Sequence, residues 1–203
     1  MRPLGLLAVV LVAAGCGSSA ATSEHPGTTT KTSRFAGAEL TPARPAPPLA
    51  LHDAHGRVYS LAAQHGRYTL VTFLYTHCPD VCPLIASNLN TALRILGPHA
   101  KVSVFAVSVD PKGDTPAAVK AYEREKRLVP QFHYLIGSRP ELMRVWRAWN
   151  EVAFVSKPAV ISHVTYTALI DPSGKERVLY DAQVKAQQVV HDLHLLSAEK
   201  NTA

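Results

Sequence analysis

The stretch Val71-Thr-Phe-Leu-Tyr-Thr-His-Cys-Pro-Asp-Val-Cys-Pro83 decides how the rest of the sequence is interpreted. Its first part is rich in β-branched and aromatic residues, which is typical of a strand buried on both faces of a sheet. Two cysteines, Cys78 and Cys82, follow this strand, and apolar residues then recur at helical spacing from Pro83 onward. The stretch therefore predicts a buried strand that leads through a cysteine-containing loop into a helix.

The spacing of Cys78 and Cys82 is compatible with three kinds of chemistry. A helix rises about 1.5 Å per residue, so four positions correspond to about 6 Å, which lies within the Cα separation of a disulfide. The positive end of the helix dipole would stabilise a thiolate and lower its pKa. Two converging thiolates are also soft ligands that suit Cu(I) or Zn(II). Spacing alone leaves open a structural disulfide, a redox dithiol and a metal site, although a disulfide across so short a loop would restrain little chain entropy.

Strands and helices alternate on both sides of the cysteine stretch. A hairpin is expected within residues 49–61, around a turn at His52-Asp-Ala-His-Gly56. Strands are then expected at residues 68–75, 101–109, 132–136, 164–170 and 176–180, and helices at residues 83–96, 114–128, 139–149 and 186–196. This order predicts an α/β fold, a mixed central sheet flanked by helices with an N-terminal β-hairpin. A cysteine pair after the first central strand and a final hairpin followed by a helix make the arrangement thioredoxin-like.

The N-terminus has the pattern of a bacterial lipoprotein signal peptide at residues 1–15. Arg2 supplies a positive charge, and the apolar run at residues 4–14 is shorter than the roughly 20 residues that span a bilayer. Small residues then lead into Cys16, which would carry the lipid after cleavage. An ordinary signal peptide with an incidental cysteine is the alternative, but it leaves an unpaired third thiol in an exported protein unexplained. The lipid would hold the domain at the outer face of the bacterial cytoplasmic membrane.

The remaining chain is expected to form a tether, one domain and a short tail. Residues 16–47 are rich in Ser, Thr, Ala, Gly and Pro, which predicts a flexible, lipid-anchored tether. Within it, Phe35 and Leu40 are large apolar residues that can dock on the edge of the domain. The domain is expected at residues 48–198 and a C-terminal tail at residues 199–203. A hydrophobic content of 47% is sufficient to bury the core of such a domain.

The charge of the chain gives little support to nucleic-acid binding. The net charge is +6, but the basic residues are scattered along the sequence and form no run of five or more. A mild positive charge is equally consistent with a position beside an anionic membrane surface.

A histidine could distinguish between the chemistries open to the cysteine pair. His77 is a poor partner for Cys78, because neighbouring residues of an extended segment point to opposite sides. His191 and His194 share a helix face that is expected to be solvated. His163 immediately precedes the expected strand at residues 164–170, at a position that lies near the cysteine loop in a thioredoxin-like fold. His163 can therefore complete a Cys-Cys-His metal site, and a capping role is an equally good interpretation.

Three motifs in this order resemble the Sco/SenC family. They are Tyr75-Thr-His-Cys-Pro-Asp-Val-Cys-Pro83, Ser108-Val-Asp-Pro-Lys-Gly-Asp-Thr-Pro116, and His163 followed by Thr167-Ala-Leu-Ile-Asp-Pro-Ser-Gly174. The family consists of membrane-anchored, thioredoxin-like copper proteins implicated in assembling the binuclear copper centre of cytochrome c oxidase subunit II. The resemblance implies that Cys78, Cys82 and His163 bind copper, as Cu(I) or Cu(II).

The resemblance also implies the partners and a redox role. A metallochaperone of this kind would receive copper from a donor protein and deliver it to cytochrome c oxidase subunit II or a similar terminal oxidase. Oxidation of Cys78 and Cys82 to a disulfide would abolish the metal site, and the same dithiol could reduce the cysteines of the partner. The chain departs from the family pattern at Ser162, where an Asp is frequent, and at Lys112-Gly113, where Glu-Arg is frequent.

Two enzymatic alternatives stay open at this point. A thiol–disulfide oxidoreductase of thioredoxin type has two residues between its cysteines, whereas this chain has three. A peroxiredoxin-like peroxidase usually has Thr or Ser three residues before the reactive cysteine, where this chain has Tyr75. Asp80 can orient the cysteine loop, Asp110 lies near the same sheet edge, and Asp114 is expected to be the N-cap of the helix at residues 114–128.

Overall fold

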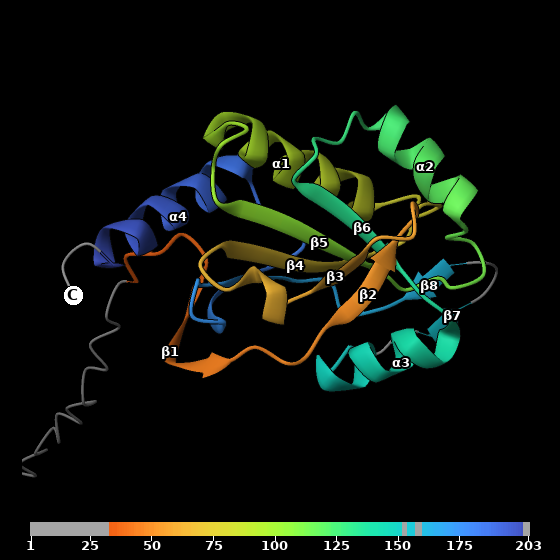
Figure 1. Cartoon of the computed structure of the whole chain (residues 1–203), viewed down its shortest axis with the longest axis horizontal. Coiled ribbons are helices and arrows are strands. Elements are labelled where there is room, and N and C mark those ends of the chain that lie inside the picture. The colour runs from red at the N-terminus through yellow and green to blue at the C-terminus, as the bar shows by residue number, and fades with distance from the viewer. Residues whose placement is uncertain (1–32, 152–153, 157–159, 201–203) are drawn as a thin grey trace, which may run out of the picture. The chain divides into compact units, whose positions relative to one another are not determined.

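Three parallel strands lie at the centre of the computed structural model (Figure 1): β4 (Tyr68–Leu74), β5 (Val102–Ser108) and β6 (Phe132–Ile136). Every residue of β4 and β5 is buried. Strands covered on both faces can be apolar without alternation, which explains the continuous runs of β-branched and aromatic residues. The structure describes residues 33–151, 154–156 and 160–200. The predicted signal peptide, Cys16 and the tether up to residue 32 lie outside the described residues.

The parallel strands belong to an eight-stranded mixed sheet. Its order is β1-β10-β9-β4-β5-β6-β2-β3, and all neighbours other than β4–β5 and β5–β6 are antiparallel. The bounds of the outer strands are β1 Ala38–Pro45, β2 Ala50–Asp53, β3 Val58–Ser60, β9 Thr167–Ile170 and β10 Lys175–Tyr180. This arrangement confirms the predicted α/β, thioredoxin-like class and the N-terminal hairpin, which is formed by β2 and β3.

Helices cover both faces of the sheet. Figure 1 shows α1 (Val81–Leu96), α2 (Pro116–Glu125) and α4 (Ala186–Lys200) on one side and α3 (Arg139–Ala148) on the other. A 3₁₀ turn, η1 (Ala62–Gln64), follows β3. Since α4 extends to Lys200, the first residues of the predicted tail belong to this helix. Within the described ranges, none of the helices combines the length and apolar character needed to cross a bilayer.

The main differences from the predicted elements lie before β9. A strand was expected at residues 164–170, but β9 begins only at Thr167. The preceding segment, where no strand was expected, contains a separate antiparallel pair, β7 (Phe154–Ser156) and β8 (Val160–Ser162). Pairing between two short segments depends on the contacts that the fold provides, so a pattern of three residues per strand is too weak to predict it.

The boundary of the domain at residue 48 was predicted too late. β1 pairs with β10 as the edge of the sheet, and Phe35 is only 5% exposed. The backbone N–H groups of Ala36 and Gly37 donate to the buried carboxylate of Asp192 on α4, at 2.8 and 3.0 Å. This strand was not predicted because β1 contains proline and is largely exposed, so it lacks the apolar pattern of a strand. Proline is tolerated in a sheet only at edges, first residues and bulges, and β1 is an edge strand.

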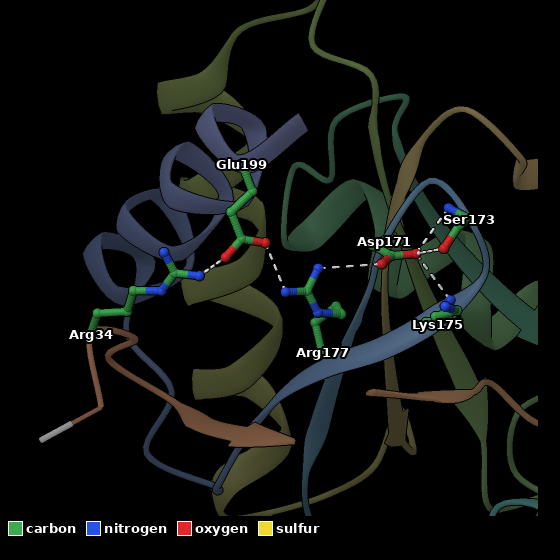
Figure 2. A network of polar contacts seen from close by, with 6 residues as sticks. All are labelled: Arg34, Asp171, Ser173, Lys175, Arg177 and Glu199. Atoms are coloured by element: carbon green, nitrogen blue, oxygen red, sulfur yellow. Dashed lines mark hydrogen bonds and ion pairs between the residues drawn. The ribbon is translucent and has the colours of Figure 1, made fainter. Parts of the chain in front are cut away.

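Ion pairs further connect this N-terminal segment with the end of the chain. Figure 2 shows Arg34 paired with Glu199 of α4, which also accepts a hydrogen bond from Arg177 at 2.8 Å. Arg177 in turn lies 3.4 Å from Asp171, whose carboxylate caps the turn into β10 by accepting from the backbone N–H groups of Ser173 and Lys175. The turn at residues 171–174 joins the two strands of the predicted final hairpin, and it is linked to both ends of the described domain.

Substitution of Phe35 tests whether residues 33–45 contribute to folding. Phe35→Ala is expected to lower the free energy of unfolding by about 3 kcal/mol, because it removes a buried aromatic ring and leaves a cavity. Leu40→Ala, which truncates a half-buried residue of β1, is the matched control and should cost clearly less. Denaturant-induced unfolding followed by circular dichroism measures both. Equal, small effects would contradict the inclusion of this segment in the core.

Candidate functional site

The two cysteines lie where β4 gives way to α1. Cys82 occupies the first turn of α1 and is fully buried, whereas Cys78 lies in the preceding loop and is partly exposed. Both are free thiols, and they are close enough to share a hydrogen bond. A turn hydrogen bond from the Cys78 N–H to the Tyr75 carbonyl, at 3.3 Å, helps to shape the loop. The structure thus confirms the predicted strand, loop and helix and gives the two sulfurs different environments.

These environments separate the acidities of the two thiols. A hydrogen bond from Cys82 lowers the pKa of Cys78 to about 5, with further stabilisation from the N–H groups of Asp80 and Cys82 and from the Tyr75 side chain. The proximity of Cys78 and burial both raise the pKa of Cys82. At neutral pH the pair therefore consists of a partly exposed Cys78 thiolate and a buried Cys82 thiol that donates to it.

A buried carboxylate fixes the start of the cysteine loop. Asp114 is 3% exposed and accepts hydrogen bonds from the Thr76 N–H and Oγ1, at 2.8 and 2.7 Å. It also accepts from Ser108 Oγ at 2.6 Å and from the Tyr134 hydroxyl at 3.1 Å. Burial raises the pKa of Asp114, while these hydrogen bonds oppose the shift. One side chain thus connects the end of β4 with β5 and β6, two residues before Cys78.

The predicted role of Asp114 as a helix N-cap is wrong. Thr115 is the N-cap of α2, and its hydroxyl accepts from the Ala118 N–H at 3.2 Å. Either residue is chemically suited to capping, so only the fold shows that the carboxylate turns inward. The presence of a second good capping residue beside Asp114 was the available signal that the acid was free for another role.

His163 lies near the cysteine pair and is connected to it through Tyr75. Its ring contacts the edge of the Tyr75 ring, with centroids 6.2 Å apart and planes at 77°. Tyr75 is the residue whose side chain also interacts with Cys78. β9 pairs with β4 so that Thr167 lies opposite Thr72, which brings the segment before β9 to the end of β4 that carries the cysteines. The predicted neighbourhood of His163 and the cysteine loop is confirmed.

The three residues do not form a closed metal cage in this structure. Across residues 33–151, 154–156 and 160–200, no group of three or more His, Cys, Asp or Glu side chains is arranged to hold a metal ion. Cys78 and Cys82 are in contact, whereas the His163 side chain is 4% exposed and lies against Tyr75 and Glu151. The arrangement is a preformed thiol pair with an imidazole nearby.

Comparison with known proteins places this site in a family. The SCO1/SenC family model matches residues 38–197, which include Cys78, Cys82 and His163. The chain belongs to the SCO1/SenC family. One relative, an SCO2-like protein of Rickettsia prowazekii, is 27% identical over 151 residues, covering 70% of this chain and 72% of that protein.

Solved structures of Sco proteins share the fold of this SCO1/SenC domain. Bradyrhizobium japonicum ScoI with copper bound is 29% identical, with a TM-score of 0.65 over 74% of this chain and 98% of that chain. BsSco, a member of the Sco family of cytochrome c oxidase assembly proteins in which a disulfide switch has been identified, is 22% identical. Its TM-score is 0.63 over 77% of this chain and 95% of that chain, which is a likeness of fold alone.

The other polar residues singled out in the sequence lie outside the thiol pair. His77 is exposed, and its Nδ1 lies 3.0 Å from Thr76 Oγ1. His191 and His194 are exposed on α4, as predicted. Asp80 is exposed at the N-cap position of α1, and its side chain makes no capping hydrogen bond. The residues that the sequence did not single out for this site are Tyr75, Thr76 and Glu151.

The acidity of Cys78 provides a pH-dependent prediction. In the reduced protein, alkylation of Cys78 should reach half of its plateau rate near pH 5, and Cys82→Ala should move this midpoint upward toward the ordinary value of 9.0. The reason is that Ala removes the thiol that donates a hydrogen bond to the Cys78 thiolate.

The same shift makes the stability of the fold depend on pH. Because folding lowers the pKa of Cys78, its thiolate stabilises the folded state above pH 9, and this contribution is lost as the pH falls toward 5.

Peptide mapping by mass spectrometry measures alkylation of Cys78 separately from that of the other thiols. Ser87→Ala, on the exposed side of α1, is the control and should leave the midpoint unchanged. An unchanged midpoint in Cys82→Ala would show that the shared hydrogen bond does not set the acidity of Cys78.

Removal of the Asp114 carboxylate should destabilise the domain. Asp114→Ala leaves the Ser108 and Tyr134 hydroxyls and the Thr76 N–H without their acceptor, so the free energy of unfolding should fall by about 3 kcal/mol. Asp110→Ala is the matched control from the same loop, because the Asp110 side chain accepts a turn hydrogen bond from the nearby Lys112 N–H and does not connect separate strands. Denaturant titration compares the two variants, and similar losses would contradict a special role for Asp114.

Proposed function

We propose that this SCO1/SenC protein is a copper metallochaperone that binds the ion through Cys78, Cys82 and His163. The observation that carries the proposal is the pairing of a Cys78 thiolate with a buried Cys82 thiol. The ring of Tyr75, which interacts with Cys78, also contacts His163. Two sulfur ligands and one imidazole suit Cu(I), which is soft and accepts low coordination numbers. Membership of the family and the copper-bound ScoI structure support this choice of metal.

In this proposal each of the three ligands has a different part in binding copper. Cys78 is already a thiolate and partly exposed, so it is suited to make the first contact with incoming copper. Cys82 must lose its proton when it binds, and the positive end of α1 favours the resulting charge. His163 has to approach the two sulfurs to complete the site, because its ring lies against Tyr75 in the present structure. A ligand that arrives last can also leave first, which is useful for passing copper to a partner.

The partner is proposed to be subunit II of a cytochrome c oxidase, or a similar terminal oxidase, with a separate protein as copper donor. Membership of the SCO1/SenC family supports this assignment, since the Sco family consists of cytochrome c oxidase assembly proteins. Lipid attachment at Cys16 would hold the domain at the outer face of the bacterial cytoplasmic membrane. The export pattern of residues 1–15 and the absence of charge between residues 3 and 16 support that location.

A second function, reduction of the partner's cysteines, is favoured by the asymmetry of the thiol pair. The Cys78 thiolate would attack one sulfur of a partner disulfide and release the other as a thiolate, which takes up a proton from solvent. Cys82 would then lose its proton and attack Cys78, which releases the second partner sulfur and leaves a Cys78–Cys82 disulfide. Two electrons pass to the partner, and the proton lost by Cys82 completes its second thiol. A partly exposed, acidic attacking thiol and a buried resolving thiol are suited to these two steps. The same reaction without copper is the thiol–disulfide oxidoreductase alternative.

Anaerobic copper titration of the reduced domain tests the main proposal. The wild type should bind about one copper per chain, since a single site is proposed. Copper binding should weaken in each of three variants, Cys78→Ser, Cys82→Ser and His163→Ala. Each loss should exceed the roughly 10- to 100-fold drop in affinity that is typical when a metal ligand loses its hydrogen-bond partner. His77→Ala is the matched control, because this exposed histidine adjoins Cys78 but should not bind the ion.

Absorption spectroscopy with Cu(II) adds a signature, a thiolate-to-copper charge-transfer band that the cysteine variants should lose. Unchanged affinity in Cys78→Ser and His163→Ala would refute the site. Rapid disulfide exchange with a model partner in the absence of copper binding would instead support the oxidoreductase alternative.

A further inference from the structure

Glu151 is a buried carboxylate beside the proposed copper ligand His163. Its side chain is fully buried, with a relative exposure of 0%. The backbone holds it firmly, because the Glu151 N–H donates to the Trp146 carbonyl at 2.7 Å just after the end of α3. The preceding residue, Asn150, has a φ of 52°, which turns the chain sharply at this point. The fold thus directs this acid from α3 toward the segment between β8 and β9.

The carboxylate contacts that segment at two adjacent residues. Glu151 Oε1 accepts a hydrogen bond from the Val164 N–H at 3.0 Å and lies 3.6 Å from His163 Nδ1. His163 Nδ1 also lies 3.2 Å from the carbonyl oxygen of Val164. Both oxygens that face Nδ1 act as acceptors, so the proton of a neutral imidazole is favoured on Nδ1. The lone pair then resides on Nε2, the nitrogen that is free to bind a metal.

The cost of burying Glu151 indicates that its role is more than packing. Its second oxygen, Oε2, is buried and has no hydrogen-bond partner among the residues that the structure describes. An unpaired buried polar atom destabilises a protein, and an apolar side chain of similar size would avoid this penalty. Within the described segments, the polar contacts of the Glu151 side chain are directed to His163 and Val164.

We propose that Glu151 is a positioning residue that fixes the tautomer and orientation of His163, so that Nε2 faces the cysteine pair. The proposal rests on the proposed function for its metal-binding consequence. Glu151 does not itself bind the ion. It anchors the backbone at Val164 and holds the Nδ1 side of the ring, while Tyr75 contacts the ring edge-on. An imidazole held in this way loses less conformational entropy when it joins the two sulfurs.

Two substitutions separate the hydrogen-bonding role from the shape of the side chain. Glu151→Gln keeps an oxygen that can accept from Val164 and His163, whereas Glu151→Leu removes it at similar volume. Glu176→Gln is the matched control, because Glu176 is also a buried acid but pairs with Arg44 on the β1–β10 edge. Glu176 lies beside Ile170, which pairs with Thr69 at the start of β4, the end opposite to the cysteines.

The first measurement is made without metal, on the reduced protein with ¹⁵N-labelled histidine. Nitrogen chemical shifts of His163 in the wild type should show the tautomer with the proton on Nδ1. Glu151→Leu should shift the population toward the other tautomer, and Glu151→Gln should largely preserve the wild-type state. A wild-type ring with its proton on Nε2, or a tautomer unchanged in Glu151→Leu, would overturn the proposal.

The second measurement is copper affinity under the same conditions. Glu151→Leu should bind copper about 10- to 100-fold more weakly than the wild type, with Glu151→Gln in between and Glu176→Gln unchanged. Copper binding that is equal in the wild type and Glu151→Leu would contradict this inference alone. Absence of copper binding by the wild type would contradict the proposed function, and the tautomer measurement would still decide whether Glu151 positions His163.

Discussion

The hydrogen bonds of the buried Asp114 carboxylate hold the functional end of the sheet together. They connect Thr76 after β4, Ser108 at the end of β5 and Tyr134 in β6. The Ser108 carbonyl also accepts from the indole of Trp146 on α3, at 3.0 Å. The ends of β4 and β5, strand β6 and helix α3 are therefore connected next to the cysteine loop. A carboxyl group buried so deeply is tolerated because four donated hydrogen bonds replace its contacts with water.

A loop fixed at its start can give its two thiols different properties. Cys78 lies outside the helix, where backbone N–H groups and the Cys82 thiol stabilise its charge. Cys82 lies within the first turn and is buried, so it keeps its proton. One thiol is thus prepared to react or bind, and the other is prepared to complete the reaction. This asymmetry is suited both to copper binding and to disulfide exchange, so the two proposed functions are compatible with one site.

The third proposed ligand is controlled by a different part of the fold. His163 follows the β7–β8 pair and is held by Tyr75 on one side and by Glu151 on the other. The sulfur ligands depend on the strand-to-helix turn, whereas the imidazole depends on α3 and on the segment before β9. A site assembled from two independently supported parts can open and close by a movement of one of them. Such a division is consistent with the proposed role, in which the copper ion is passed on to a partner.

The sequence by itself determined the strand, loop and helix around Cys78 and Cys82, the α/β class and the neighbourhood of His163. These features depend on local patterns: buried β-branched runs, helical spacing and the fixed order of elements. The tertiary structure decided that Asp114 turns inward, that β1 extends the sheet, and that Glu151 lies against His163. Each of these depends on contacts between residues far apart in the chain. Residues 114 and 76, 38 and 179, and 151 and 164 have no local pattern that pairs them, so only the packed fold could bring them together.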